Sequence, residues 1–291
     1  MTWILTIVGV GLIAIALRDI FHTLWHPSGF GTLSRLVFAA IWRIAKPRKG
    51  GRSTELAGPV GLLATLAVWT LLLIAGFCLV YLPQMPQGFY FGSSLRPGVS
   101  SDVVASLYLS MVALTTLGLG DIQPATPLLR LVVPLEALLG FVLLTAGISW
   151  ILQLYPALIR RRALARRLTT MARHAADEVV ATGEPSVAVQ HLEGVRDSLA
   201  AAEMDLVQYA ESYYFREQLS DLSLAAALPY VATLAAAGER SASSEVQQAA
   251  AMLGGGLSAF LDVARGYLGD DLDAGLTLSG FAADHDHVAL N

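Results

Sequence analysis

The chain has 291 residues, of which 55% are hydrophobic and only 14% are charged. Soluble globular domains carry about 25% charged residues, so this composition predicts a membrane protein. The net charge of −4 is unevenly spread, with nine Lys/Arg against five Asp/Glu in residues 1–155 and ten against eighteen in residues 156–291. The acidic second half argues against a nucleic-acid-binding face, and the single cysteine, Cys78, excludes an intrachain disulfide.

Three apolar stretches are candidates for membrane helices: Trp3–Leu17, Gly58–Leu82 and Leu131–Tyr155. A helix needs roughly 20 apolar residues to cross about 30 Å of hydrocarbon. The second and third stretches meet this length. The first meets it only if it continues to about Trp25, with Arg18, Asp19 and His22 near an interface.

The segment Thr32–Lys46 is apolar but contains Arg35 and Arg43. We expect a helix lying in the cytoplasmic interface, which would place the N-terminus outside. The alternative is a short additional span, which would place the N-terminus inside.

Basic residues fix the orientation, because Lys and Arg accumulate on the cytoplasmic side of membrane helices. They precede the second stretch and follow the third, at Arg43, Lys46, Arg48, Lys49 and Arg52, and at Arg160, Arg161, Arg162, Arg166 and Arg167. We therefore expect a multi-pass plasma-membrane protein with a cytoplasmic C-terminal tail. Arg160–Arg167 are interpreted as a topology anchor, with binding of anionic lipid headgroups as a second possible use.

The connection between the second and third stretches contains a short helix. Ser100, Ser101 and Asp102 are typical of a helix N-terminus, and the apolar run Val103–Leu114 follows them. About twelve residues rise roughly 18 Å, which is too short to cross the membrane. The run should enter the membrane and stop, with its partially negative C-terminal end favouring a cation.

The sequence Thr115-Thr116-Leu117-Gly118-Leu119-Gly120-Asp121 follows this helix. The alternating glycines accept a left-handed backbone at little energetic cost. A backbone that alternates between hands can aim successive carbonyl oxygens to one side. Four such segments would form stacked oxygen rings that replace the hydration shell of an ion.

The hexamer Thr116–Asp121 resembles T-V-G-Y-G-D, the selectivity filter of potassium channels. The similarity extends over about Gly58–Tyr155 to the bacterial two-transmembrane potassium channels. It implies a homotetramer with K⁺ as the permeant ion and no cofactor. It also implies a filter formed by Thr116, Leu117, Gly118, Leu119 and Gly120, with K⁺ bound by the carbonyls of Thr116–Leu119 and by the Thr116 hydroxyl. The resemblance further implies that Thr115, Asp121 and Tyr108 support the filter. It places a gating hinge at Gly140.

The sequence departs from the family pattern in two places. Leu119 replaces the filter tyrosine, and Tyr108-Leu109 replaces the aromatic pair that braces it; Val112 stands where some members carry a pore-helix glutamate. We expect selectivity for K⁺ over Na⁺. The alternatives are a weakly selective cation channel and a membrane-anchored helical sensor or scaffold without conduction.

Glu136 is the only charged residue of the third stretch. A charged side chain inside a membrane helix is costly and is a candidate functional residue. We expect Glu136 to pair with Arg130 near the outer interface, with a position facing the vestibule as the alternative.

The tail, residues 157–291, predicts a helical bundle or coiled coil with an unknown regulator. Its apolar seam has 3-4 spacing and consists of Leu192, Val195, Leu199, Ala202, Leu206, Tyr209 and Tyr213. Further helices are expected at 162–181, 220–237 and 245–268, with breaks at 183–185, Gly238 and 254–256. We interpret Asp284-His285-Asp286-His287 as a solvated end rather than a metal site.

The sequence therefore predicts an all-α membrane protein: two transmembrane helices flanking a re-entrant pore helix and filter, plus an N-terminal hydrophobic helix and a helical cytoplasmic tail. No set of nucleophile, base and orienting residue indicates an enzyme. The expected domains are 1–57 (membrane and interfacial helices), 58–156 (pore domain, with outer helix 58–82, pore helix 102–114, filter 116–120 and inner helix 130–155) and 157–291 (cytoplasmic helices).

Overall fold

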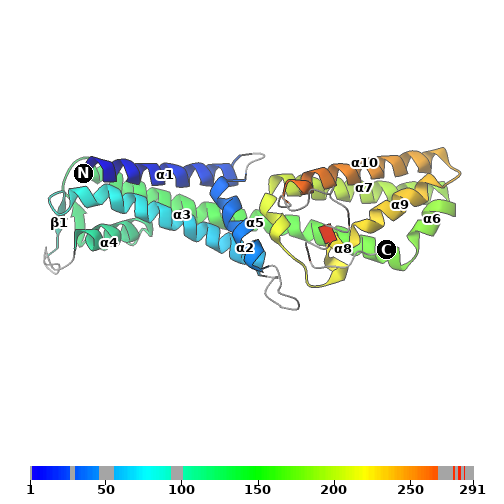
Figure 1. Ribbon diagram of the computed structural model, residues 1–291, viewed down its shortest axis with the longest axis horizontal. Coiled ribbons are helices and arrows are strands. Elements are labelled where there is room, and N and C mark those ends of the chain that lie inside the picture. Colours follow the sequence, from blue (N-terminus) through cyan, green and yellow to red (C-terminus); the bar gives the residue numbers. More distant parts are fainter. Residues whose placement is uncertain are drawn as a thin grey trace. The chain divides into compact units, whose positions relative to one another are not determined.

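The computed structural model describes residues 2–26, 30–45, 56–92, 101–267, 278, 281–282 and 285 (Figure 1). These residues form two compact units. The membrane unit comprises 1–37 and 61–152, and the bundle unit comprises 38–60 and 153–291. The basic residues Lys46, Arg48, Lys49 and Arg52, and the terminal Asp284, Asp286 and His287, lie outside the described residues.

Among the described residues, three helices are long and apolar enough to cross a membrane: α1 (Thr2–Leu24), α3 (Ala57–Tyr81) and α5 (Leu129–Arg173). The helix α2 (Thr32–Ala45) has 14 residues and rises about 21 Å, which is too short for a span. The expected all-α membrane fold is confirmed, and the length of α2 favours an interfacial helix over an additional span.

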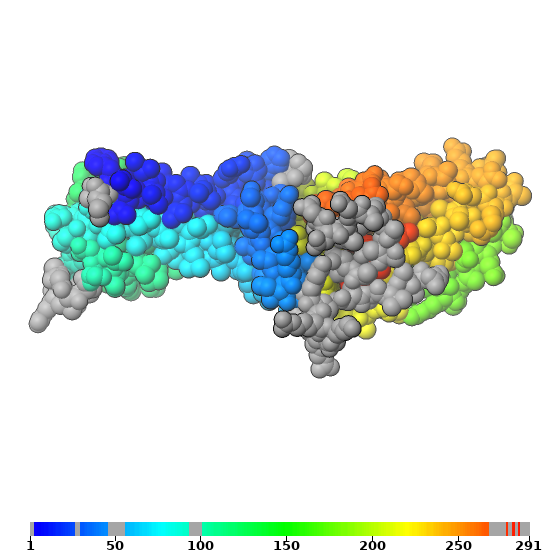
Figure 2. Space-filling model, viewed as in Figure 1, coloured from blue at the N-terminus to red at the C-terminus, as the bar shows by residue number. Residues whose placement is uncertain are grey.

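Two glycines allow α1 and α3 to pack closely, and the two helices lie side by side in Figures 1 and 2. A Cβ atom on Gly9 would lie 2.5 Å from the carbonyl oxygen of Gly76, and a Cβ on Gly76 would lie 2.6 Å from the side chain of Ile13. Small residues permit such close approach between membrane helices, where packing rather than burial from water drives association.

The buried carboxylate of Asp19 joins α1, α2 and α3. It accepts hydrogen bonds from the backbone N–H groups of Leu33 (2.8 Å) and Ser34 (3.1 Å), from the Ser34 hydroxyl (2.6 Å) and from the Trp69 indole (2.9 Å). A carboxylate at this position caps the N-terminus of α2. The Trp69 ring in turn packs against Trp150 of α5, with ring centroids 5.7 Å apart. Asp19 therefore lies in a buried hydrogen-bond network.

We predict that Asp19→Ala lowers the free energy of unfolding by about 3 kcal/mol, because buried donors lose their acceptor. Thermal unfolding of the purified chain in detergent measures this. Arg18→Ala, at the exposed neighbouring position, is the control and should change stability little. Equal effects of the two variants would contradict the role of Asp19.

The bundle unit is built on the apolar seam of α7 (Pro185–Gln208), which packs against α10 (Ser244–Arg265). The helices α6 (Ala176–Thr182) and α9 (Pro229–Glu239) complete the bundle. The seam is a bundle face, buried at Ala188, Leu192, Val195, Leu199, Ala202 and Leu206. It ends earlier than expected, because the helix stops at Gln208 and Tyr213 belongs to the 3-10 turn η3 (Ala210–Tyr214).

Several expected helix boundaries are wrong. The inner helix does not end at residue 155, because α5 continues through Pro156 to Arg173. The helix expected at 220–237 is divided into η4 (Ser220–Leu222), α8 (Leu224–Ala227) and α9, with Pro229 as the first residue of α9. Gly254–Gly256 lie inside α10, because the buried face of that helix, from Val246 to Ala264, holds it across the glycines.

The second half of α2 packs on protein in the bundle unit. Its Phe38 ring lies 5.3 Å from the Tyr214 ring, and its Trp42 ring lies 5.5 Å from the same ring. The guanidinium carbon of Arg216 lies 3.9 Å from the centroid of the Trp42 ring, a cation–π contact. Phe38 and Trp42 of α2 therefore pack on aromatic residues of the bundle. The position of α2 in the cytoplasmic interface stays a prediction.

Candidate ion-conducting site

The predicted pore helix is α4 (Asp102–Leu114), at the residues expected. Ser101 caps its N-terminus by accepting a hydrogen bond from the backbone N–H of Val104 (3.4 Å). Its 13 residues rise about 20 Å, so α4 is too short to cross. It lies beside α3 in the membrane unit (Figure 1), and its C-terminal end leads directly into the predicted filter.

The predicted filter has the alternating backbone that its sequence indicates. Thr116, Gly118 and Gly120 have φ angles of 57°, 56° and 74°, whereas Leu117 and Leu119 are not in the left-handed region. The segment leaves α4 through hydrogen bonds from the N–H of Thr116 to the Ala113 carbonyl and from the N–H of Leu117 to the Val112 carbonyl. A threonine in the left-handed region is uncommon and strained. Its strain is compatible with a segment held from both ends.

Side chains from the pore helix and the following strand hold the outer end of this segment. Asp121 accepts a hydrogen bond from the Tyr108 hydroxyl (2.5 Å) and from the N–H of Ile122 (3.0 Å). The Gly120 carbonyl accepts one from the Gln123 side chain (2.9 Å). The structure thus brings Tyr108 and Asp121 together, and it adds Gln123, which the sequence analysis missed because an amide three residues beyond a glycine carries no distinctive signal.

A two-stranded antiparallel sheet braces the same end. The strand β1 (Phe89–Phe91) pairs with β2 (Ile122–Pro124), and the N–H of Gly92 donates to the Asp121 carbonyl (2.7 Å). The hydroxyl of Thr115, at the inner end, donates back to the Met111 carbonyl of α4 (2.7 Å). Thr115 therefore ends the pore helix, and its hydroxyl does not contact the outer end of the predicted filter.

Gly140 of α5 lies against the end of the pore helix. A Cβ atom there would overlap the carbonyl oxygen of Leu114, so only glycine permits this approach of α5 to α4. Gly147 lies two turns further along α5, where a Cβ atom would lie 3.0 Å from the side chain of Leu66 of α3. The helix continues unbroken through both glycines. Close packing explains Gly140, and a hinge at this residue stays a prediction.

A cavity of about 360 Å³ lies at the inner end of the predicted filter. Thr115 and Thr116 line one part of it, and Gly140, Phe141 and further apolar residues of α3 and α5 line the rest. The residues from Thr115 to Gly120 are all exposed in the single chain. The segment from Thr115 to Gly120 is therefore uncovered in the single chain.

Glu136 is neither paired with Arg130 nor exposed to a vestibule. Its side chain is completely buried and accepts a hydrogen bond from the Tyr81 hydroxyl (2.6 Å), with the Ser110 hydroxyl 2.5 Å from its other oxygen. Arg130 instead donates to the Pro124 carbonyl (3.2 Å). The expectation of an interfacial ion pair is wrong, because three helices of the membrane unit enclose the carboxyl group.

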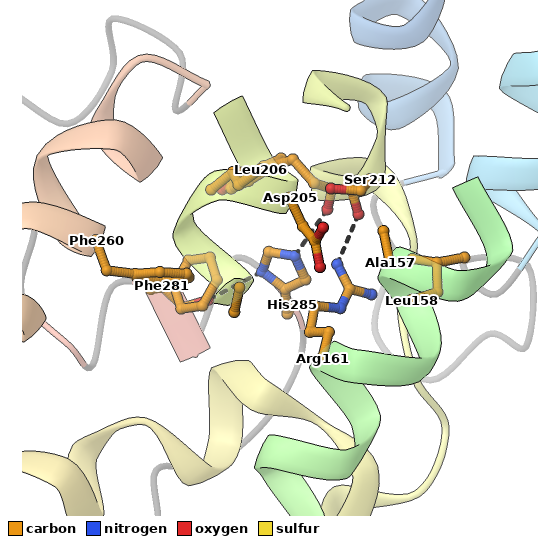
Figure 3. Close-up of a pocket in the computed structure, with 11 residues that line it drawn as sticks. Ala157, Leu158, Arg161, Asp205, Leu206, Ser212, Phe260, Phe281 and His285 are labelled. Atoms are coloured by element: carbon orange, nitrogen blue, oxygen red, sulfur yellow. Dashed lines mark hydrogen bonds between the residues drawn. The ribbon is translucent and has the colours of Figure 1, made fainter. Parts of the chain in front are cut away.

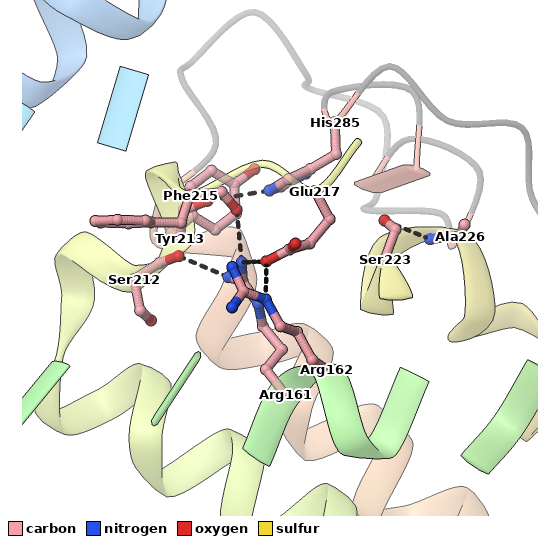
Figure 4. A network of polar contacts seen from close by, with 9 residues as sticks. All are labelled: Arg161, Arg162, Ser212, Tyr213, Phe215, Glu217, Ser223, Ala226 and His285. Atoms are coloured by element: carbon pink, nitrogen blue, oxygen red, sulfur yellow. Dashed lines mark hydrogen bonds and ion pairs between the residues drawn. The ribbon is translucent and has the colours of Figure 1, made fainter. Parts of the chain in front are cut away.

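The arginines at the start of the bundle unit are bound within that unit. Arg160 pairs with Asp205 (2.8 Å), and the Arg161 guanidinium donates to the carbonyls of Ser212 and Phe215, both at 2.6 Å. Figure 4 shows Arg161 and Arg162 converging on this segment and on Glu217. Arg162 pairs with Glu217, Arg166 with Asp221, and Arg167 donates to the Gly194 carbonyl. These contacts give each of the five arginines a partner within the bundle unit, and binding of anionic lipid stays a prediction.

His285 is buried, which contradicts the expectation of a solvated end at this residue. Its Nδ1 lies 3.1 Å from the Phe281 carbonyl oxygen, and its Nε2 lies 3.0 Å from the Tyr213 carbonyl oxygen. Figure 3 shows the ring beside Arg161 and Phe281. Both partners are acceptors, so both contacts are hydrogen bonds when each ring nitrogen carries a proton. Within the described residues, no group of three or more His, Cys, Asp or Glu side chains forms a metal site.

A family model described as ion channel matches residues 67–155. In this part of the chain, two long apolar helices flank a short helix and a loop with alternating glycines. The chain is also 29% identical over 177 residues to YdjJ, an uncharacterized membrane protein of Bacillus subtilis (strain 168). That match covers 60% of this chain and 50% of the relative, so the chain spans about half the length of that relative. No solved structure matches the chain.

We predict that Arg161→Met lowers the free energy of unfolding of the bundle unit by about 2 kcal/mol, because two carbonyls lose a charged donor. Arg166→Met is the matched control. Its exposed ion pair contributes less than about 1 kcal/mol. Chemical unfolding of the purified chain measures both. If both variants instead left stability unchanged and weakened binding to anionic vesicles, the arginines would be a lipid site.

Proposed function

We propose that this protein is a potassium-selective ion channel, and that it conducts through carbonyl rings formed by Thr116–Gly120 from four identical chains. The observation that carries the proposal is the left-handed backbone at Thr116, Gly118 and Gly120. Alternation of hand turns successive carbonyls toward one side, where they can replace the hydration shell of an ion. The Thr116 hydroxyl would add a further ring at the inner end.

The proposal needs four chains because one chain leaves the segment exposed. Leu117 and Leu119 are 62% and 57% exposed in the single chain. Apolar side chains and non-helical backbone at membrane depth require cover by protein or by a water-filled pore. A fourfold arrangement supplies both, with the leucines against neighbouring chains and the carbonyls toward the axis.

Two hydrogen bonds at the outer end of the segment support selectivity for K⁺, although Leu119 replaces the filter tyrosine. The Tyr108–Asp121 hydrogen bond and the Gln123–Gly120 hydrogen bond restrain the outer end of the segment. Restrained oxygen rings favour the ion whose hydration shell they match. We place the protein in the plasma membrane with the C-terminal unit in the cytoplasm, because of the basic residues that flank the pore domain.

Gly118→Ala and Gly120→Ala test the proposal. Alanine in the left-handed region costs roughly 1–2 kcal/mol per residue, so each variant should reduce the population of the intact filter about tenfold per chain. We expect loss of K⁺-selective flux from proteoliposomes that hold a K⁺ gradient. Gly11→Ala is the matched control, since a Cβ there meets no atom within 4 Å.

Two outcomes of this experiment contradict the proposal. If both filter variants transport ions as the unsubstituted chain does, residues 116–120 are not the conducting segment. If the unsubstituted chain assembles only as a dimer on crosslinking, the fourfold pore is wrong and a membrane-anchored sensor or scaffold becomes the better reading of the chain.

A further inference from the structure

The buried carboxyl group of Glu136 lies where three helices of the membrane unit meet. It belongs to α5, and its side chain is 0% exposed. Tyr81 at the end of α3 donates to its Oε2 at 2.6 Å, and the Ser110 hydroxyl of α4 lies 2.5 Å from its Oε1. Among the described residues, no Lys or Arg forms an ion pair with it. An ionised carboxylate in such a place is costly, because nothing balances its charge.

The number of protons available around Ser110 indicates the protonation state of the Glu136 carboxyl group. The Ser110 hydroxyl has one proton but lies within reach of two acceptors, the Ile74 carbonyl oxygen (3.1 Å) and Glu136 Oε1 (2.5 Å). If Glu136 carries a proton on Oε1, it donates to Ser110, and Ser110 donates to Ile74. Tyr81 then donates to Oε2, and each of these contacts is a hydrogen bond.

The contact also has a mechanical consequence for the pore helix. Ser110 and Leu114 are four residues apart on α4, and Glu136 and Gly140 are four residues apart on α5, so each pair shares a helix face. Ser110 meets Glu136, and the Leu114 carbonyl meets Gly140. Two contacts one turn apart fix how far α4 can slide or rotate against α5, and the second lies directly before Thr115 and Thr116.

We propose that Glu136 holds its proton and is a positioning residue, which fixes the pore helix between α3 and α5 and thereby the inner end of the filter. Its effect on selectivity rests on the proposed function. Its protonation and its bonds to Ser110 and Tyr81 do not. The other titratable group on this stretch of α3 is the buried thiol of Cys78, one turn before Tyr81. On α4, Tyr108 is engaged with Asp121 and Asp102 is exposed.

The test compares Glu136→Gln, Glu136→Leu and Ser110→Ala in the full chain in liposomes. The amide of Glu136→Gln can donate to Ser110 and accept from Tyr81 as the protonated acid does, whereas leucine can do neither. Asp102→Asn is the matched carboxyl-to-amide control at an exposed position. The readouts are the infrared carbonyl band of a protonated carboxylic acid, the unfolding temperature, and the ratio of K⁺ to Na⁺ flux.

We expect the protonated-acid band in the unsubstituted chain and in Asp102→Asn, and its loss in both Glu136 variants. Glu136→Gln should keep the unfolding temperature and the flux ratio. Glu136→Leu should lower the unfolding temperature and reduce the flux ratio, because a lost buried hydrogen bond lowers the population of the correctly positioned pore helix about tenfold. Ser110→Ala should shift the carbonyl band of Glu136, because the carboxyl group loses the Ser110 hydroxyl as its hydrogen-bond partner.

Three results would overturn the inference: a missing band in the unsubstituted chain, equal damage by glutamine and leucine, or a harmless Glu136→Leu. The first two results would mean that Glu136 is ionised. The third would mean that Glu136 does not position the pore helix. If the unsubstituted chain carries no selective flux, the proposed function fails. The band and the unfolding temperatures still decide the state and role of Glu136 in that case.

Discussion

Residues 115–121 cross part of the membrane unit without the internal hydrogen bonds of a helix, and this constraint explains much of the structure around them. Non-helical backbone at membrane depth persists only where protein encloses it or where it lines a wet cavity. Here the left-handed conformations at Thr116, Gly118 and Gly120 turn the segment into a regular one. Residues 115–120 of the segment are exposed in the single chain. In our proposal neighbouring chains cover its apolar side, and a file of K⁺ ions lies on the open side.

Separate contacts hold the two ends of the segment. The outer end is held by Tyr108, Gln123 and the pairing of β1 with β2. The inner end depends on the position of α4, which is set by the approach of Gly140 to Leu114 and by the bonds around Glu136. A strained threonine at the junction is tolerable because its neighbours on both sides are fixed.

The sequence predicted the all-α membrane class and the bounds of the pore helix, because apolar length, a helix N-terminus and alternating glycines are local signals. It could not predict the partners of Glu136, which come from helices 26 and 55 residues away in the chain. For the same reason, the sequence did not predict that Asp19 caps the N-terminus of α2. The burial of His285 was also missed, because a residue near the end of the sequence was assumed to be solvated. The partners of Arg160–Arg167 within the bundle could not be predicted, because they lie 27 to 55 residues further along the chain. The inner helix was expected to end at residue 155, where the apolar stretch ends, although α5 continues to Arg173.

The central claim is that the segment Thr116–Gly120 forms a K⁺-selective pore although Leu119 replaces the filter tyrosine. Single-channel recording of the purified chain in planar bilayers, with K⁺ on one side and Na⁺ on the other, tests it most directly. The account predicts openings that reverse near the potassium limit, because the oxygen rings are held at both ends. Clear openings that reverse near zero would contradict it and assign a weakly selective cation channel.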